Sequence, residues 1–241
     1  MVAVRYFHGG VQSTGIARPQ RIRGDGSPKE FAAGTFVTRT EKLDSEDRLN
    51  ASPSKRQHPR QTGEDRLPGD LPPEDLVERM IRVDHAGEFG AVRIYEGQLA
   101  VLGKGPAGTA LRRMAEQERE HLETFNKLIV DRRVRPTALT PLWHVAGFAL
   151  GAGTALMGEK AAHACTVAIE EVIDEHYDHQ SRQLGDDEAS LRDTIDRFRA
   201  DEIAHRDEAL DSGARDAPGY EALTSAIKAG SRLAIWLSER L

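Results

Sequence analysis

Apolar residues recur at helical spacing through most of residues 71–241. They return every three or four positions, as at Leu76, Met80 and Ile81, which is the spacing of one buried helix face. Glycine and proline interrupt this pattern at a few points, where helices are expected to end. We therefore predict five helices. The first begins between about 71 and 74 and ends at about 102, and the others cover about 107–134, 158–184, 187–212 and 219–241.

Residues 1–70 lack any such pattern and are rich in Gly, Pro, Ser, Thr and Arg. The small apolar surface of these residues cannot offset the conformational entropy lost on ordering. We therefore predict that residues 1–70 are a disordered extension and that residues 71–241 form one helical domain. Residues 1–24 contain four arginines and no acid, as in an organelle transit peptide. An unstructured tail is the alternative, because Gly9, Gly10 and Pro19 would break an amphipathic helix.

The segment 136–158 stands out because it contains no Asp, Glu, Lys or Arg. It is long enough to span a bilayer, but prolines and glycines interrupt it. We expect it to lie in a membrane interface, with Trp143 at headgroup depth. A buried helical hairpin and a spanning helix are the alternatives. No signal peptide precedes the domain, so the chain is expected to meet a membrane from the inside.

Charge and cysteine content narrow the choice of partner and compartment. The chain has a net charge of −6, and its acidic surplus lies in residues 71–241, because the first 70 residues are net basic. An acidic body argues against nucleic acid as a partner. The single cysteine, Cys165, excludes an intrachain disulfide and fits a reducing compartment.

The motif Glu-x-x-His occurs twice, at 118–121 and 202–205. Residues three apart lie on the same helix face, so the carboxylate and the imidazole can reach one metal ion. Each motif follows, by about thirty residues, a glutamate on the preceding predicted helix, which completes the ligand set of ferritin-like dimetal bundles. Such donors suit iron or manganese. We predict an all-α, ferritin-like four-helix bundle whose metal ligands are Glu88, Glu118, His121, Glu170, Glu202 and His205.

Helical neighbours separate these glutamates from solvated ones. Glu118 shares its face with apolar residues such as Leu111, and Glu170 shares its face with Val167 and Tyr177, whereas Glu171 sits among other acids. Buried carboxylates without cations would repel one another at a large desolvation cost. A charged, solvated bundle without metal is therefore disfavoured.

Other polar residues near the candidate ligands carry weaker predictions. Tyr95 and Tyr177 each follow a candidate ligand by seven residues and could bond ligands or relay electrons, with plain core packing as the alternative. Asp84 and His85 could orient a ligand histidine or simply belong to the helix start. His176 is a candidate substrate contact.

Several stretches also resemble one known family, demethoxyubiquinone hydroxylase. The resemblance covers about 71–241 and follows the family's order. It is most specific in the HAGE and ACTVAIEE segments, which separate this family from ferritins and rubrerythrins. The matching stretches are RMIRVDHAGEFGAVRIYEGQ at 79–98, EREHLETF at 118–125, ACTVAIEEVIDEHY at 164–177, FRADEIAHRD at 198–207 and AIWLSERL at 234–241.

This resemblance implies a specific reaction. The six candidate ligands match the family's six, which hold two iron ions (Fe2+), and His176 and Tyr177 match positions near its active site. The implied enzyme is a di-iron monooxygenase that uses O2 to hydroxylate the ring of a polyprenyl methoxy-methyl benzoquinol (demethoxyubiquinol), the penultimate step of ubiquinone biosynthesis. Electrons would come from the quinol or from a reduced nicotinamide.

The resemblance also implies a location and partners. The family is peripheral to the inner membrane, on the cytoplasmic side in bacteria or the matrix side in mitochondria, and 136–158 would match its membrane-facing part. In eukaryotic members a lipid-binding accessory protein presents the substrate. A ferritin-like iron-handling protein and a peroxide-consuming enzyme are the alternatives, but neither explains the apolar segment.

Overall fold

The computed structural model describes residues 69–241, and these residues are almost entirely helical. Short 3-10 turns at Asp186–Glu188 and Ala214–Asp216 join some of the helices. The predicted all-α fold is confirmed. The helices are α1 (Pro73–Leu102), α2 (Gly108–Asp131), α3 (Thr140–Leu156), α4 (Glu159–Gln183), α5 (Ala189–Asp211) and α6 (Tyr220–Ser238).

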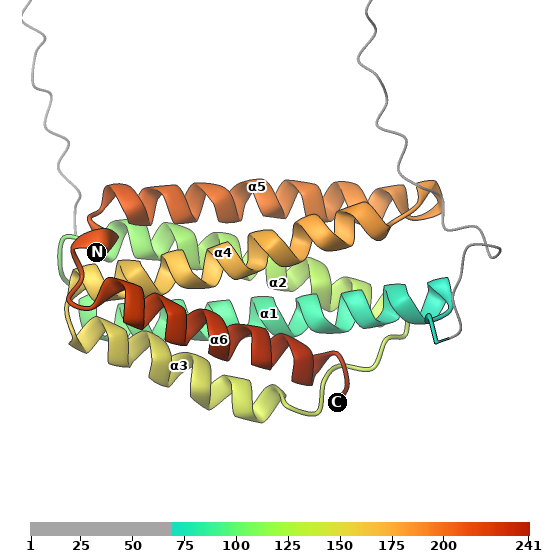
Figure 1. The fold of residues 1–241 in the computed structure, drawn as a ribbon, viewed down its shortest axis with the longest axis horizontal. Coiled ribbons are helices and arrows are strands. Elements are labelled where there is room, and N and C mark those ends of the chain that lie inside the picture. The colour runs from blue at the N-terminus through green and yellow to red at the C-terminus, as the bar shows by residue number, and fades with distance from the viewer. Residues whose placement is uncertain (1–68) are drawn as a thin grey trace, which may run out of the picture. The chain divides into compact units, whose positions relative to one another are not determined.

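The helices of this domain stack in three layers of two (Figure 1). The middle layer holds α1 and α4. Helices α2 and α5 pack on one side of it, each against the long helix that precedes it in the chain, and α3 and α6 pack on the other side. Helices α1, α2, α4 and α5 thus form a four-helix bundle, and α3 and α6 cover one face of it.

The helix boundaries follow from local sequence. Pro73 begins α1 and is followed by Glu74 and Asp75, which favour the positive end of the helix dipole. Helices α4 and α6 each begin after a glycine with a positive φ, 120° at Gly158 and 67° at Gly219, a conformation that other residues rarely adopt. All five predicted helices are confirmed, with ends that differ by a few residues.

The uncharged segment forms one helix, α3, so the buried-hairpin alternative is wrong. Glycines at 147 and 151 let α3 lie against the backbone of α1, because an added Cβ at Gly151 would overlap the carbonyl oxygen of Ile94. The outer side of α3 stays uncovered, with Val145 65% and Leu156 77% exposed. None of the helices in residues 69–241 is long and apolar enough to cross a membrane.

The predicted extension, residues 1–70, falls outside the described residues except for its last two positions, and so does the candidate transit peptide. Disorder of that extension therefore stays a prediction.

Candidate metal centre

The six predicted ligands meet in the middle of the four-helix bundle. Glu88 comes from α1, residues 118 and 121 from α2, Glu170 from α4, and residues 202 and 205 from α5. None of the six is more than 2% exposed. Apolar clusters lie on either side of them along the bundle, one around Phe125 and Phe198 and one around Leu111. Helical spacing therefore places the polar set inside an otherwise apolar core.

Nitrogen and oxygen atoms of these side chains form two overlapping groups in which all candidate ligand atoms lie within 4.8 Å of one another. Each group could hold one metal ion, and the glutamates of the two Glu-x-x-His motifs belong to both. One group is Glu88, Glu118, His121 and Glu202; the other is Glu118, Glu170, Glu202 and His205.

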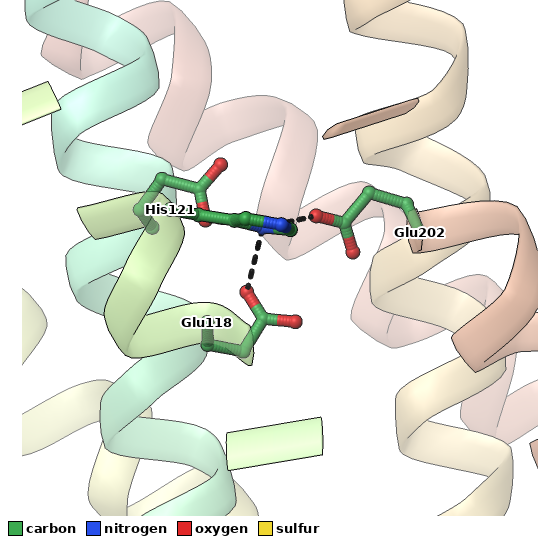
Figure 2. Close-up of side chains that lie close together, drawn as sticks. Glu118, His121 and Glu202 are labelled. Carbon is green, nitrogen blue, oxygen red and sulfur yellow. Dashed lines mark ion pairs between the residues drawn. The ribbon is translucent and has the colours of Figure 1, made fainter. Parts of the chain in front are cut away.

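Each histidine of the two Glu-x-x-His motifs contacts the glutamate of the other motif, across the space between α2 and α5. His121 Nδ1 lies 3.1 Å from Glu202 Oε1 and 3.9 Å from Glu118 Oε2, and Figure 2 shows its ring between these two carboxylates. His205 Nδ1 likewise lies 3.0 Å from Glu118 Oε1 and 3.5 Å from Glu202 Oε2. Each imidazole is therefore nearer to the glutamate of the other motif than to its own.

Each of the six residues has at least one buried nitrogen or oxygen without a hydrogen-bond partner, and both oxygens of Glu118 and Glu202 are in this state. Buried polar atoms left unpaired are costly, so such a concentration is rare in a protein core. Carboxylate oxygens with one imidazole on each side form a donor set that iron accepts. The residues therefore fit a pair of metal ions.

The pKa values of the buried residues also favour a site that binds cations. Burial, and then the nearby charge of Glu202, raise the pKa of Glu118 well above its usual range, and the same two causes raise the pKa of Glu170. Burial alone would lower the pKa of His121, but the carboxylates of Glu202 and Glu88 outweigh it and raise the pKa to about 12. Without metal, protons offset the charge that cations would otherwise neutralise.

The outer nitrogens of both histidines are held by residues that our sequence analysis did not single out. His121 Nε2 lies 3.2 Å from Asp201 Oδ2, and His205 Nε2 lies 3.1 Å from Gln117 Oε1. These contacts turn Nδ1 of each ring toward the cluster. The available signal was position, since each partner immediately precedes the glutamate of a motif.

The sequence left two roles open for Asp84 and His85, orientation of a ligand histidine or a place at the helix start. Asp84 instead bonds residues of α4, and His85 Nε2 lies 3.0 Å from Asn126 Oδ1. Neither role is confirmed, because these partners are not the candidate ligand histidines and because both residues lie well inside α1 and not at its start.

The two tyrosines bond the glutamates that come from α1 and α4. Tyr95 of α1 donates to Glu170 Oε1 of α4 at 2.8 Å, and Tyr177 of α4 donates to Glu88 Oε1 of α1. Both tyrosines are buried. The alternative in which they bond candidate ligands is confirmed, and the two bonds tie the middle layer together across the site.

A cavity of about 580 Å³ lies between α1, α3, α4 and α6 and reaches the candidate metal centre from one side. Glu88, His176 and Tyr177 form part of its wall, next to small residues such as Gly87 and Gly90. Most of the remaining wall is aliphatic. A ligand pocket of this kind combines an apolar body with a few polar groups at one end.

The chain is similar to proteins named as hydroxylases along most of its described length. Residues 75–238 match the family described as ubiquinone biosynthesis protein COQ7. A Rhodospirillum rubrum protein named 3-demethoxyubiquinol 3-hydroxylase is 63% identical over 183 residues, which cover 76% of this chain and 86% of that protein.

Mitochondrial proteins are also similar. The human protein named NADPH-dependent 3-demethoxyubiquinone 3-hydroxylase, mitochondrial, is 54% identical over 169 residues, covering 68% of this chain and 78% of that protein. A Saccharomyces cerevisiae protein named 5-demethoxyubiquinone hydroxylase, mitochondrial, is 43% identical over 183 residues, covering 69% and 78%. The extent and level of these matches show that the chain belongs to the COQ7 family of ubiquinone biosynthesis proteins.

Proposed function

We propose that this protein is a di-iron monooxygenase that hydroxylates the ring of demethoxyubiquinol with O2, in the penultimate step of ubiquinone biosynthesis. Family membership supports the reaction class. The observation that carries the proposal is the position of the apolar cavity, whose wall includes Glu88, a member of the buried carboxylate and histidine cluster.

Glu88, Glu118, His121, Glu170, Glu202 and His205 would hold two iron ions. Four carboxylates carry four negative charges, which two divalent cations balance, and this removes the repulsion that raises the pKa values of the buried glutamates. The iron pair, when bound, supplies the activation of dioxygen. The protein supplies the geometry, through the crossed motifs, and a core that keeps water away.

The cavity would receive the quinol, with its isoprenoid tail against the aliphatic walls and its ring near Glu88. His176 and Tyr177 are the proposed catalytic residues, because both lie in the cavity wall beside Glu88. The hydroxyl of Tyr177 donates to Glu88, so Tyr177 holds that carboxylate in place while its ring faces the substrate space.

A peripheral site on the inner membrane is part of the proposal. The helices that cover the cavity, α3 and α6, also expose apolar side chains, among them Val145 at 65% and Leu233 at 56%. An uncovered apolar face beside a cavity for a lipid suits contact with the bilayer surface, on the cytoplasmic side in a bacterium or the matrix side in a mitochondrion. A lipid-presenting accessory protein could use the same face.

Iron content and turnover test the function together. We expect about two irons per chain and conversion of a short-chain demethoxyubiquinol to its hydroxylated product under O2, with NADPH as the reductant that the human relative's name specifies. Two irons without hydroxylation would move the function to ferritin-like iron handling or peroxide consumption. Absence of iron from protein expressed with ample iron would contradict the metal assignment.

Glu170→Ala tests the ligand assignment against a matched neighbour. We expect this variant to lose iron and turnover while it keeps its helical content. Glu171→Ala is the control, because Glu171 is the next residue of α4 and pairs with Lys228 near the surface. Retained iron and turnover in Glu170→Ala would overturn the assignment of that ligand.

A further inference from the structure

A second polar cluster lies in the wall of the cavity, one helical turn from Glu88. Its centre is Asp84, four residues earlier on α1 and 3% exposed. Gln180 Nε2 donates to Asp84 Oδ1 at 2.7 Å, and His176 Nε2 lies 3.4 Å from the same oxygen. His176 and Gln180 also contact each other, at 2.8 Å. One carboxylate oxygen therefore engages both side chains of α4.

The other oxygen, Asp84 Oδ2, is buried and has no hydrogen-bond partner. A buried carboxylate oxygen is costly to leave unpaired. Asp84 and His176 belong to the cavity wall. Asp84 Oδ2 is therefore a hydrogen-bond acceptor that no protein donor uses. Because the Asp84 side chain has no accessible surface, a ligand in the cavity reaches this oxygen only when the wall beside it moves.

Open space lies along α1 beside this acceptor. A Cβ added to Gly87 or to Gly90 would meet no atom within 4 Å, and both glycines line the cavity. Gly147, in the same wall, differs because its added Cβ would come 2.9 Å from the carbonyl oxygen of Gly90. Close helix packing thus requires glycine at 147, whereas at 87 and 90 the missing side chains leave room for a flat ring.

We propose that Asp84 Oδ2 accepts a hydrogen bond from a ring hydroxyl of the quinol, and that His176 and Gln180 position the carboxylate for it. The identity of the ring rests on the proposed function. Asp84 and Glu88 are four residues apart, so they are separated by about 6 Å along α1, slightly more than one helical turn. A ring anchored at Asp84 and lying over Gly87 therefore presents its far edge to the metal ligands. No covalent bond changes in this step.

The competing explanation is that the cluster only ties α1 to α4. Asp84→Asn separates the two roles, because the asparagine carbonyl keeps an acceptor for Gln180 while an NH2 group replaces the free oxygen. A donor in that place cannot accept a hydrogen bond from a hydroxyl. The helix-to-helix link survives in this variant, and the proposed quinol contact does not.

Binding can be measured without turnover on iron-loaded protein under nitrogen. Trp143 lines the cavity, and a Trp236→Phe background leaves it as the only tryptophan. The probes are a short-chain demethoxyubiquinol and a prenyl alcohol of the same chain length, which lacks the ring. The change in Trp143 fluorescence reports the binding of each.

We expect Asp84→Asn to weaken quinol binding about tenfold or more, the scale of a lost hydrogen bond to a charged group, and to leave binding of the alcohol unchanged. Gly87→Val, which fills the space beside Asp84, should have the same selective effect and provides a second test if Asp84→Asn folds poorly. Asp75→Asn, an exposed aspartate of the same helix, is the control and should change neither affinity.

Equal weakening of both probes, or no weakening of either, would overturn the proposal and leave a structural role for the cluster. Failure of the unaltered protein to bind the quinol would overturn it as well. A protein that binds quinol through Asp84 but does not hydroxylate it would support this inference and contradict the proposed function. If Asp84→Asn still hydroxylates the quinol and binds it with unchanged affinity, the proposed function is supported and this inference is contradicted.

Discussion

The two halves of the candidate metal centre are built on one plan. One half contains His121 and Glu88, the other contains His205 and Glu170, and both share Glu118 and Glu202. In each half a polar side chain holds the outer nitrogen of the histidine, and a tyrosine from the facing middle-layer helix bonds the unshared glutamate. The correspondence follows from two helical hairpins that each supply one glutamate and one Glu-x-x-His motif.

The surroundings of the two halves differ. The partner of His121 is a carboxylate, Asp201, whereas the partner of His205 is the neutral amide of Gln117. The cavity wall includes Glu88 but not Glu170. Nearly equal ligand sets therefore lie in unequal environments, and a substrate in the cavity meets the half that contains His121 and Glu88.

Loss of a shared ligand should break both halves together and have the largest effect. Glu118→Ala removes a carboxylate that belongs to both groups, so we expect iron content to fall from about two per chain to nearly none and hydroxylation to disappear. Metal analysis and turnover check this result. Glu120→Ala, an exposed residue of the same helix, should behave like the unaltered protein. A Glu118→Ala protein that still binds two irons would contradict the shared role.

The next largest effect is expected when the hydrogen-bond partner of His121 is made chemically like the partner of His205. Asp201→Asn replaces the charged partner of His121 with an amide like that of Gln117. We expect iron affinity in that half to fall about 10- to 100-fold, as for other residues that orient a metal-bound histidine, while the other half keeps its ion. Titration with a competing chelator would resolve the two affinities, and two equal losses would argue against separate halves.

The tyrosines offer a finer test of the one-sided cavity. Tyr177→Phe and Tyr95→Phe each remove one hydroxyl bond to a glutamate, but only Tyr177 lines the cavity. We expect Tyr177→Phe to lower kcat/KM about tenfold and Tyr95→Phe to lower it less than about threefold, on the scale of one hydrogen bond to a charged group. Equal effects would mean that the cavity does not distinguish the halves.

The smallest expected effect is on the pH dependence of thermal stability. It tests the buried charge that both halves contain. In the metal-free protein, burial and then the charge of Glu202 raise the pKa values of Glu118 and Glu170. Protonation of these two glutamates therefore favours the folded state, and this contribution to stability is lost as the pH rises above about 4.5. The pKa of His121, raised to about 12, adds a loss that begins above about 6.5. We expect the Tm advantage of iron-loaded over metal-free protein to widen by roughly 5 °C between pH 5 and pH 8. A gap independent of pH would contradict this account.

The six residues that meet in the candidate metal centre could be predicted from sequence because their choice depends on local rules. Helical spacing puts Glu118 and His121 on one face, and apolar neighbours separate Glu170 from Glu171. These rules operate within one helix, so no knowledge of the packing was needed. The family resemblance led to the same residues independently.

Features that depend on how helices meet were missed. Asp201 and Gln117 reach histidines on the opposite helix, so their role depends on how α2 and α5 face each other. The path of 136–158 was left open because its composition alone does not show that Gly151 would lie against the α1 backbone. The cavity likewise arises only when α3 and α6 pack over α1 and α4.

The position of α6 after all six candidate ligands has a consequence for shortened chains. The last of these ligands is His205, whereas α6 supplies one wall of the cavity, and Ser238 of α6 accepts a hydrogen bond from Trp143 of α3. A stop codon or proteolytic cut ahead of α6 would leave all six candidate ligands in the product and remove that wall. If the six residues hold iron as proposed, the shortened protein would combine a complete iron site with a cavity that lacks one wall, a combination suited to reduction of oxygen without hydroxylation.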